Sequence, residues 1–407
     1  MPHSIRSDPS SRSREAQSAL NRRNLPFLVS AGLLWFSLFT YVALLTPYVE
    51  GLGASHAQAG IIVGSFGFIQ IFLRMPMGFL SDRLGRRKLF IQLAFLFSFL
   101  SAAGFLASRN LVFILLSRTL AGVAATNWVH FNVLYTSYHS PSESSKAVGA
   151  LNSIAMVAQT LALYAGGYIA DQGSTSAVFI LGGTAAAAGF VLSFFLTENR
   201  EAPTTRIPTA TYFAVVGNAR LRTIAGFAIL IQILTYAVTF GFIPVYAATR
   251  FGASGSRLAL QTVVATIAGA LSSLAGNTRL VRRFGEMPLA VTGLVICALA
   301  SAATPLADSL AALGLLQIVS GLGRGMAFTM AMALAIGSVP ADRRATAMGF
   351  YQACYGIGMV AGPVIMGALA DSGGLAFGFI MIGGMTLAGT ALMTLVYRRV
   401  AVRPASA

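Results

Sequence analysis

Three arginines and one histidine of this 407-residue sequence stand inside long apolar stretches, where ionisable side chains are rare. Arg74, Arg118 and Arg324 have mostly hydrophobic neighbours, and His130 is the one histidine in such a setting. The planar guanidinium of arginine binds carboxylates and other anionic groups through parallel N–H donors. Arginine can also extend its stem and bond to water or to backbone carbonyls. These residues therefore predict either a site for an anionic solute or a set of structural cations.

His130 belongs to the most polar patch inside any of these stretches, together with Thr126 and Asn127. Residues three and four apart adjoin on one face of an α-helix, so both would lie beside the histidine. Histidine changes charge near neutral pH and can therefore bind a proton or a polar solute. Polar side chains in an apolar bundle also join neighbouring helices by hydrogen bonds. Both interpretations of His130 are open.

A wider set of polar and aromatic residues is expected to contact a bound solute. Asn152 and Gln352 stand 200 positions apart, at equivalent places of an internal repeat, and Gln159 lies two turns after Asn152 on the same helix face. Each aromatic side chain can instead serve packing. The full set predicted to bind the solute is Arg74, Trp35, Phe39, Thr126, Asn127, His130, Asn152, Gln159, Gln232, Tyr236, Arg324, Tyr351, Gln352 and Tyr355.

Aspartate and glutamate are absent from the middle of the apolar stretches. A proton carrier built on a buried carboxylate is therefore not visible in the sequence. The two cysteines, Cys297 and Cys354, stand in apolar surroundings, which favours small buried residues over a disulfide or a metal site. No phosphate-binding loop of the form Gly-x-x-x-x-Gly-Lys-(Ser/Thr) occurs, which argues against ATP-driven action. We expect no cofactor, no metal and no enzymatic activity.

The composition indicates an integral membrane protein. The chain is 56% hydrophobic and 10% charged, with a mean hydropathy of +0.74, whereas soluble domains carry about 25% charged residues. Stretches of about 20 apolar residues, long enough to cross a bilayer as helices, recur along it. The twelve predicted spans are 27–49, 59–80, 89–108, 111–137, 146–169, 176–197, 221–246, 258–278, 288–305, 309–338, 345–369 and 375–397.

The distribution of lysine and arginine predicts the orientation. With a cytoplasmic N-terminus, 22 of these residues lie on the cytoplasmic side and three, Arg109, Arg250 and Arg257, on the other side. Both termini are therefore expected in the cytoplasm, behind a basic tail over 1–26. The net charge of +16 is explained by topology and by contact with anionic lipids, and it does not indicate binding to nucleic acid.

Two halves of the chain repeat each other at an offset of about 200 residues. Ala147-Val148-Gly149 corresponds to Ala347-Met348-Gly349, and Ala170-Asp171 corresponds to Ala370-Asp371. Such repeats place a binding site near mid-membrane between the halves of many transporters. The predicted domains are a six-helix bundle over 27–197, a cytoplasmic linker over 198–220, a second six-helix bundle over 221–397 and a cytoplasmic tail over 398–407.

A polar hairpin joins the second and third apolar stretches, with the sequence Gly78-Phe79-Leu80-Ser81-Asp82-Arg83-Leu84-Gly85-Arg86-Arg87-Lys88. It resembles the loop Gly-x-Leu-(Ala/Ser)-Asp-Arg-x-Gly-Arg-Arg of the major facilitator superfamily, and each fixed position matches. The resemblance implies an all-α membrane protein with twelve transmembrane helices in two pseudo-symmetric six-helix bundles. It also implies that helices 1, 4, 7 and 10 line a central cavity.

The same resemblance implies a conformational latch on the cytoplasmic side, in which Asp82 meets the start of the eleventh helix. A carboxylate at a helix N-terminus gains about 0.3–2 kcal/mol from the free N–H groups and the dipole. The residues assigned to the latch are Gly78, Asp82, Arg83, Gly85, Arg86 and Arg344. In the second half the acid is replaced by Arg282. This predicts an ion pair of Arg282 or Arg283 with Glu143 when the cytoplasmic side is closed.

Arg118-Thr119-Leu120-Ala121-Gly122 resembles the motif Arg-x-x-Gln-Gly of the proton-coupled exporters in this superfamily, with Ala121 in place of glutamine. The resemblance implies a role of Arg118 in proton coupling, and we add His130 and Asp82 as candidates for the same role. The helix-5 motif of the antiporters is poorly kept, because Ala162 and Leu163 stand where Gly-Pro is expected. This departure leaves the direction of transport open.

The sequence thus predicts a secondary transporter that moves a small organic solute by alternating access. Proton-coupled efflux of an anionic or zwitterionic drug or metabolite is favoured, and a symporter that imports a small organic anion is the alternative. A membrane-embedded enzyme and a receptor that does not transport are less well supported. We expect a monomer in the cytoplasmic (inner) membrane, with a proton as the coupling ion.

Overall fold

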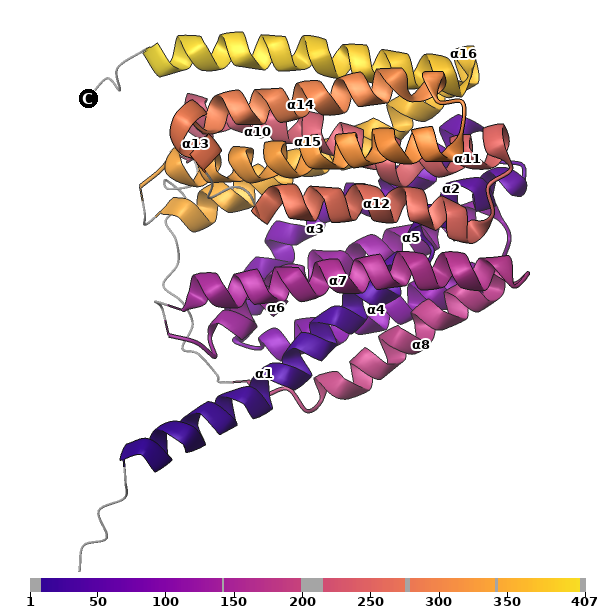
Figure 1. Cartoon of the computed structure of the whole chain (residues 1–407). Coiled ribbons are helices and arrows are strands. Elements are labelled where there is room, and N and C mark those ends of the chain that lie inside the picture. Colours follow the sequence, from indigo (N-terminus) through magenta and orange to yellow (C-terminus); the bar gives the residue numbers. More distant parts are fainter. Residues whose placement is uncertain (1–8, 141–142, 199–214, 275–278, 341–342, 403–407) are drawn as a thin grey trace, which may run out of the picture.

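The structure, a computed structural model, describes residues 9–140, 143–198, 215–274, 279–340 and 343–402. All regular elements in these ranges are helices (Figure 1). Those of the first half are α1 (Pro9–Phe39), α2 (Val42–Gly51), α3 (His56–Leu84), α4 (Arg87–Ala107), α5 (Leu111–Thr126), α6 (Trp128–Thr136), α7 (Ser144–Asp171) and α8 (Thr175–Ser193). Those of the second half are α10 (Ala219–Leu234), η1 (Thr235–Phe242), α11 (Ile243–Phe251), α12 (Gly255–Leu274), α13 (Arg279–Phe284), α14 (Glu286–Ala303), η3 (Thr304–Leu306), α15 (Leu310–Gly337) and α16 (Arg344–Val402).

These elements make twelve membrane crossings. Ten helical segments of the described residues are long and apolar enough to span a bilayer. The last of them is two crossings, because Gly374 inside α16 has a φ of 83° and interrupts the helix. The 20-residue helix α12, which packs between α7 and α15, completes the set. The prediction of twelve transmembrane helices is confirmed.

Three crossings that were predicted as continuous helices are interrupted. The first is broken between α1 and α2, the fourth between α5 and α6 at Asn127, and the seventh contains the π-helix η1. The backbone stays bonded at the breaks, since the N–H of Leu44 donates to Tyr41 O at 3.0 Å and that of His130 to Asn127 O at 2.9 Å. Irregular backbone at membrane depth is tolerated where it is buried in protein. Pro244 then lies in the first turn of α11, where its missing N–H costs no hydrogen bond.

Some predicted boundaries also shift. The basic tail predicted over 1–26 is helical from Pro9, where α1 begins, because that segment contains no residue that breaks a helix before Pro26. The final helix likewise continues to Val402 instead of ending at 397. Most of the linker predicted over 198–220 lies outside the described residues, and the second half begins with α10 at Ala219.

The two halves meet along two helix pairs, α3 with α16 and α7 with α12. Small residues allow the backbones to approach closely, as in many membrane helix pairs. A Cβ atom at Gly60 of α3 would collide with the carbonyl oxygen of Pro363 in α16. In the second pair, a Cβ at Gly167 of α7 would lie 2.6 Å from that of Ala259 in α12. These close contacts fix the two halves against each other near the N-terminal ends of α3 and α12.

The halves are closed together on one side of the membrane. The start of α1 and the end of α16 lie at the left of Figure 1, which is the cytoplasmic side, and α2 and α11 lie at the opposite, outer side. At the outer side Asp171 and Asp371 bridge the halves, as described below. Toward the cytoplasmic ends, a Cβ at Gly78, Gly149 or Gly349 would meet no atom within 4 Å. The described contacts between the halves therefore concentrate at the outer side.

Candidate functional site

Tyr236 marks the centre of the candidate site. It lies in η1, and its hydroxyl interacts electrostatically with the guanidinium groups of Arg74, Arg118 and Arg324. These arginines come from α3, α5 and α15, so the site draws on both halves of the chain. A π-helical turn widens the backbone, and such turns occur frequently at functional sites. The structure thus brings together the three arginines that the sequence singled out.

Arg118 is enclosed by aromatic rings. Its side chain is 2% exposed, and its Cζ lies 4.3 Å from the ring centre of Phe66 and 5.5 Å from that of Tyr41. One terminal nitrogen donates to the Tyr41 hydroxyl at 3.2 Å, and Nε has no hydrogen-bond partner. Cation–π contacts of this kind stabilise a desolvated guanidinium by about 2 kcal/mol or more. Arg118 therefore does not extend to water, and its role in binding a solute stays a prediction.

Arg74 joins the halves through neutral acceptors. One terminal nitrogen donates to Gln352 Oε1 at 3.1 Å and to the Tyr355 hydroxyl at 3.3 Å, both in α16. The other donates to Gln70 Oε1 at 3.0 Å, one turn earlier in α3. Three predicted solute-binding residues, Arg74, Gln352 and Tyr355, thus form one hydrogen-bonded group. None of these partners neutralises the positive charge of the arginine.

Arg324 of α15 contributes the third cation. It donates to the backbone carbonyl of Ala265 in α12 at 3.1 Å, and its Cζ lies 5.8 Å from the ring centre of Phe240. Its Nη1 atom is buried and has no hydrogen-bond partner. Within the described ranges, none of the three arginines forms a salt bridge with a carboxylate. The site therefore concentrates positive charge that no carboxylate of the described ranges pairs with.

A chain of aromatic rings connects the arginines. The rings of Phe66 and Tyr236 lie 6.3 Å apart, those of Tyr236 and Phe240 5.6 Å, and those of Phe240 and Phe39 5.7 Å. The ring of Trp35 continues the series at 5.7 Å from Phe39. Aromatic faces beside guanidinium groups suit a solute that combines an anionic group with an apolar ring.

Four residues of this cluster were missed by sequence reasoning: Phe66, Gln70, Phe240 and Tyr41. Helical spacing indicates three of them, because Phe66 and Gln70 stand eight and four positions before Arg74, and Phe240 stands four after Tyr236. Tyr41 lies in the break between α1 and α2, which the hydrophobic pattern does not show.

The polar patch around His130 lies apart from the arginine cluster in its contacts. The His130 ring stacks on Phe90 of α4, with 4.6 Å between the ring centres. Thr126 and Asn127 donate to carbonyls of their own helix, those of Gly122 at 2.9 Å and Val123 at 3.0 Å. The side-chain hydrogen bonds of Thr126 and Asn127 therefore stay within α5 and do not reach the imidazole ring of His130. The roles assigned to these three residues stay predictions.

The remaining candidates have fewer contacts. Asn152 is exposed, and Gln159 and Gln232 are half-buried. Tyr351 is fully buried beside Tyr355, with 6.0 Å between the ring centres and no partner for its hydroxyl. Trp35 and Phe39 extend the aromatic chain toward Trp128, whose ring lies 5.3 Å from that of Trp35. Their role in binding the solute stays a prediction.

The cytoplasmic hairpin forms the end of α3. Gly85 caps this helix in the left-handed conformation, with a φ of 59°, and its N–H donates to Ser81 O at 2.9 Å. Arg83, Arg86 and Arg344 are exposed, and Gly78 has open space around it. The side chain of Asp82 lies outside the described residues. Its contact with the start of the eleventh helix therefore stays a prediction.

The predicted pair of Glu143 with Arg282 or Arg283 does not form in this state. Glu143 instead accepts a hydrogen bond from the Ser140 hydroxyl at 2.8 Å, which lowers the pKa of its carboxyl. Both arginines are exposed, and the described residues show no salt bridge between them and Glu143. The absence fits the arrangement of the halves, which touch at the outer side and not at these cytoplasmic ends.

Comparisons with known proteins place the chain in a single family. A family model described as Major Facilitator Superfamily matches residues 27–225 and 225–407. The chain is 24% identical over 378 residues to "Multidrug resistance protein MdtG" of Citrobacter koseri, covering 90% of this chain and 93% of the relative. It is 22% identical over 361 residues to "Quinolone resistance protein NorA" of Staphylococcus aureus, covering 86% and 91%.

Solved structures share the fold. The crystal structure of a bacterial homologue of the human lysosomal transporter Spinster, in an inward-facing and unoccupied conformation, matches with a TM-score of 0.79 and 16% identity. The match covers 95% of this chain and 99% of that one. The likeness therefore extends over both six-helix bundles.

Proposed function

The chain belongs to the major facilitator superfamily, and from this membership we propose that it exports a small organic solute bearing an anionic group in exchange for protons. It is a multi-pass membrane transporter for a small molecule, and not an enzyme. The proposal concerns the solute class, the direction, the coupling ion and the residues of the site. It also retains the two bundles over 27–197 and 221–397, a monomer, and the cytoplasmic membrane of a bacterium as location.

The observation that carries the proposal is the convergence of Arg74, Arg118 and Arg324 on Tyr236, with no carboxylate partner among the residues that the structure describes. A buried positive charge without a counterion is costly, so the site favours a ligand that supplies negative charge. The free Nη1 of Arg324 and the Nε of Arg118 offer donors for a carboxylate. The aromatic chain from Phe66 to Phe39 supports an aromatic or otherwise apolar body for the same solute.

Direction and coupling draw on different support. The relatives whose names describe drug resistance favour export from the cell. Arg118, whose motif resembles that of proton-coupled exporters, is the candidate that links proton movement to solute binding. A second anion is a poor coupling ion, because the anionic solute would repel it from the same arginines. A proton can be exchanged for the solute without this conflict, since acids elsewhere in the chain can bind it. An importer of an organic anion would use the same cluster, so the direction of flux must be measured.

The experiment is transport by the purified full chain in proteoliposomes. The probes are radiolabelled salicylate as an anion, ciprofloxacin as a zwitterion and tetraphenylphosphonium as a lipophilic cation. We expect counterflow of the anion or the zwitterion, stimulation by a pH gradient, and a loss of about tenfold or more in Arg324→Gln, since a charged hydrogen bond contributes about 1.5–3 kcal/mol. Arg109→Gln, an exposed arginine at the outer side, is the matched control.

Two outcomes would overturn parts of this proposal. Movement of the lipophilic cation alone would exclude an anion site at the arginine cluster. Movement of the anion in the same direction as protons that enter the cytoplasm would show import and not export.

A further inference from the structure

Two aspartates at equivalent places of the repeat cap helices of the opposite half at the outer side. Asp371, near the end of the eleventh crossing, accepts hydrogen bonds from the backbone N–H of His56 at 2.9 Å and of Ala57 at 3.0 Å. Both donors belong to the first turn of α3 in the first half. Asp171, at the end of α7, accepts from the N–H of Ser256 at 3.1 Å and from the Ser254 hydroxyl at 3.2 Å, at the start of α12 in the second half.

Each carboxylate satisfies free N–H groups at the positive end of a helix, which is a favourable arrangement. Both contacts cross between the halves, and both lie where the glycine-lined helix pairs approach most closely. Opening of the outer side separates α3 from α16 and α7 from α12, so it breaks both contacts. The two aspartates therefore stabilise the state in which the outer side is closed.

We propose that Asp171 and Asp371 form an outer latch for the transport cycle, and that only its Asp371 side responds to pH, through His56 and Glu50. The proposal deepens the proposed function, because alternating access requires a device that releases the outer side. It differs from the cytoplasmic hairpin latch in its residues and its side of the membrane.

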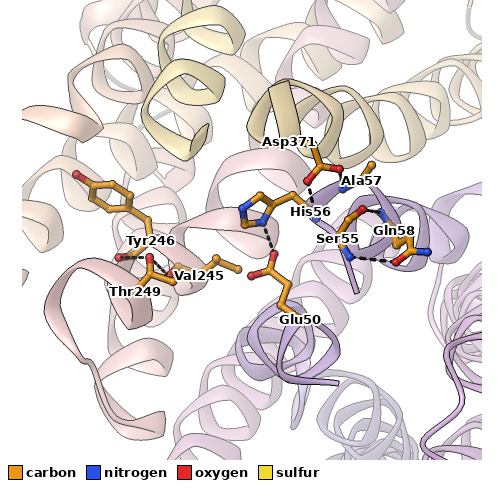
Figure 2. Close-up of polar contacts among 9 residues, drawn as sticks. All are labelled: Glu50, Ser55, His56, Ala57, Gln58, Val245, Tyr246, Thr249 and Asp371. Carbon is orange, nitrogen blue, oxygen red and sulfur yellow. Dashed lines mark hydrogen bonds and ion pairs between the residues drawn. The ribbon is translucent and has the colours of Figure 1, made fainter. Parts of the chain in front are cut away.

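His56 lies between two carboxylates. Its Nδ1 is 2.7 Å from Glu50 Oε1, and its backbone N–H is the donor to Asp371 (Figure 2). Glu50 comes from α2 of the same half, and the uncharged ring of Phe242, from η1 of the other half, lies 6.1 Å from the imidazole. Among the described residues, Glu50 interacts electrostatically with both His56 and Asp371, and Asp371 also interacts with His56.

The Asp171 side has no titratable counterpart of this pair. Gly53-Ala54-Ser55 corresponds to Gly252-Ala253-Ser254, which places Thr249 at the repeat position of Glu50. The Thr249 hydroxyl donates to Val245 O at 2.9 Å within its own helix (Figure 2). Gly255 stands at the position of His56. The two sides of the latch thus share the aspartate cap, while the histidine and the glutamate occur on one side alone.

The sign of the pH response follows from which contacts cross the interface. Glu50 stays beside the His56 ring in every state, since both belong to one half, whereas Asp371 reaches the backbone N–H of His56 only when the outer side is closed. Because the closed state places the negative charge of Asp371 at the first turn of α3, which carries His56, protonation of the His56–Glu50 pair favours that state by linkage. Acid on the outer side should close the outer latch, as an exporter that exchanges solute for external protons requires.

The test measures the outer distance between the halves in the full chain. Spin labels are attached to cysteines introduced at Ala107 and Leu306, which are exposed at the outer ends of the two halves, in a Cys354→Ser background. Distance distributions in nanodiscs give the outer-open population without any substrate. We expect Asp171→Asn and Asp371→Asn each to raise this population by about fivefold, and the double variant to raise it further. Asp308→Asn, an exposed outer acid, is the control.

The pH arm compares about pH 7.5 with about pH 5.5, a range in which histidine titrates. The parent and Asp171→Asn should both close on acidification, whereas His56→Gln and Asp371→Asn should lose this response. Outer distances that are unchanged in both aspartate variants would overturn the latch. An unchanged pH response in His56→Gln would overturn the role of the histidine.

The readout also separates this proposal from the proposed function. Solute class and direction are tested by flux, and the latch is tested by distances without solute. A latch that responds as described, with no flux of any anion, would refute the function and leave the latch. Chain integrity in each variant is checked by size-exclusion chromatography and by thermal unfolding in detergent.

Discussion

Arg118 occupies the most enclosed position of the three central arginines. Phe66 and Tyr41 cover its guanidinium, and the Tyr41 hydroxyl is the one acceptor of its hydrogen bonds in the described part of the chain. A flat, delocalised cation fits between two rings, whereas the ammonium group of lysine is compact and strongly hydrated. The position therefore selects arginine by shape as well as by charge.

We predict that Arg118→Lys reduces transport by about tenfold or more although the charge is kept. The substitution removes cation–π contact, worth about 0.5–2 kcal/mol, and leaves the Tyr41 hydroxyl without its donor. Initial rates of uptake in proteoliposomes measure the effect. Arg109→Lys at the exposed outer side should retain the parental rate. A rate near the parental value in Arg118→Lys would show that charge alone suffices at this position.

The seventh crossing is the element that brings Tyr236 into the centre. The segment from α10 through η1 to α11 is an α-helix at both ends and a π-helix in the middle. The wider turn of η1 presents Tyr236 and Phe240 to the three arginines. Gly241 of this segment has no room for a side chain, because a Cβ there would lie 2.5 Å from the carbonyl oxygen of Tyr236 in the same helix.

Gly241→Ala should therefore displace the carbonyl of Tyr236 and disturb the site. We predict an increase in the apparent KM of about tenfold, equivalent to about 1.4 kcal/mol of binding free energy, with normal insertion into the membrane. Concentration-dependent uptake measures this change. Gly337→Ala, at a position where a Cβ meets nothing within 4 Å, is the matched control. Equal KM values for the two variants would mean that η1 tolerates the methyl group.

At the scale of the whole molecule, the two bundles touch at the outer side and leave their cytoplasmic ends apart. Glu143 and Arg282 lie at those ends, and both are exposed and unpaired with each other. Alternating access closes the cytoplasmic side in the other half of the cycle. The pairing predicted from the sequence belongs to that second state and stays a prediction for it.

A charge exchange tests the pair. We predict that Glu143→Arg and Arg282→Glu each slow transport by about two- to fivefold, since exposed ion pairs contribute about 0.2–1 kcal/mol. The double variant should recover most of the parental rate, because the pair is restored with reversed polarity. Losses that simply add in the double variant would exclude the pairing. Raised salt should reduce all of these differences through screening.

The sequence by itself determined the membrane class, the twelve crossings, the orientation and the two-fold repeat. Each of these depends on properties that act locally or on average: apolar runs of sufficient length, the placement of lysine and arginine, and motifs within one hairpin. The arginines were also found this way, because a charge in an apolar run stands out whatever its partners are. The sequence could indicate such residues, and it could not say which of them meet.

The tertiary structure alone decided which predicted residues share a site. Arg74 of α3 and Arg324 of α15 share a site with Tyr236 of η1, while His130 of α6 stacks on Phe90 of α4, because the packing of the helices selects which faces meet. The sequence likewise did not show which residues of the two halves are in contact. His56 and Asp371 are 315 positions apart, and the packing of α3 against α16 makes them neighbours.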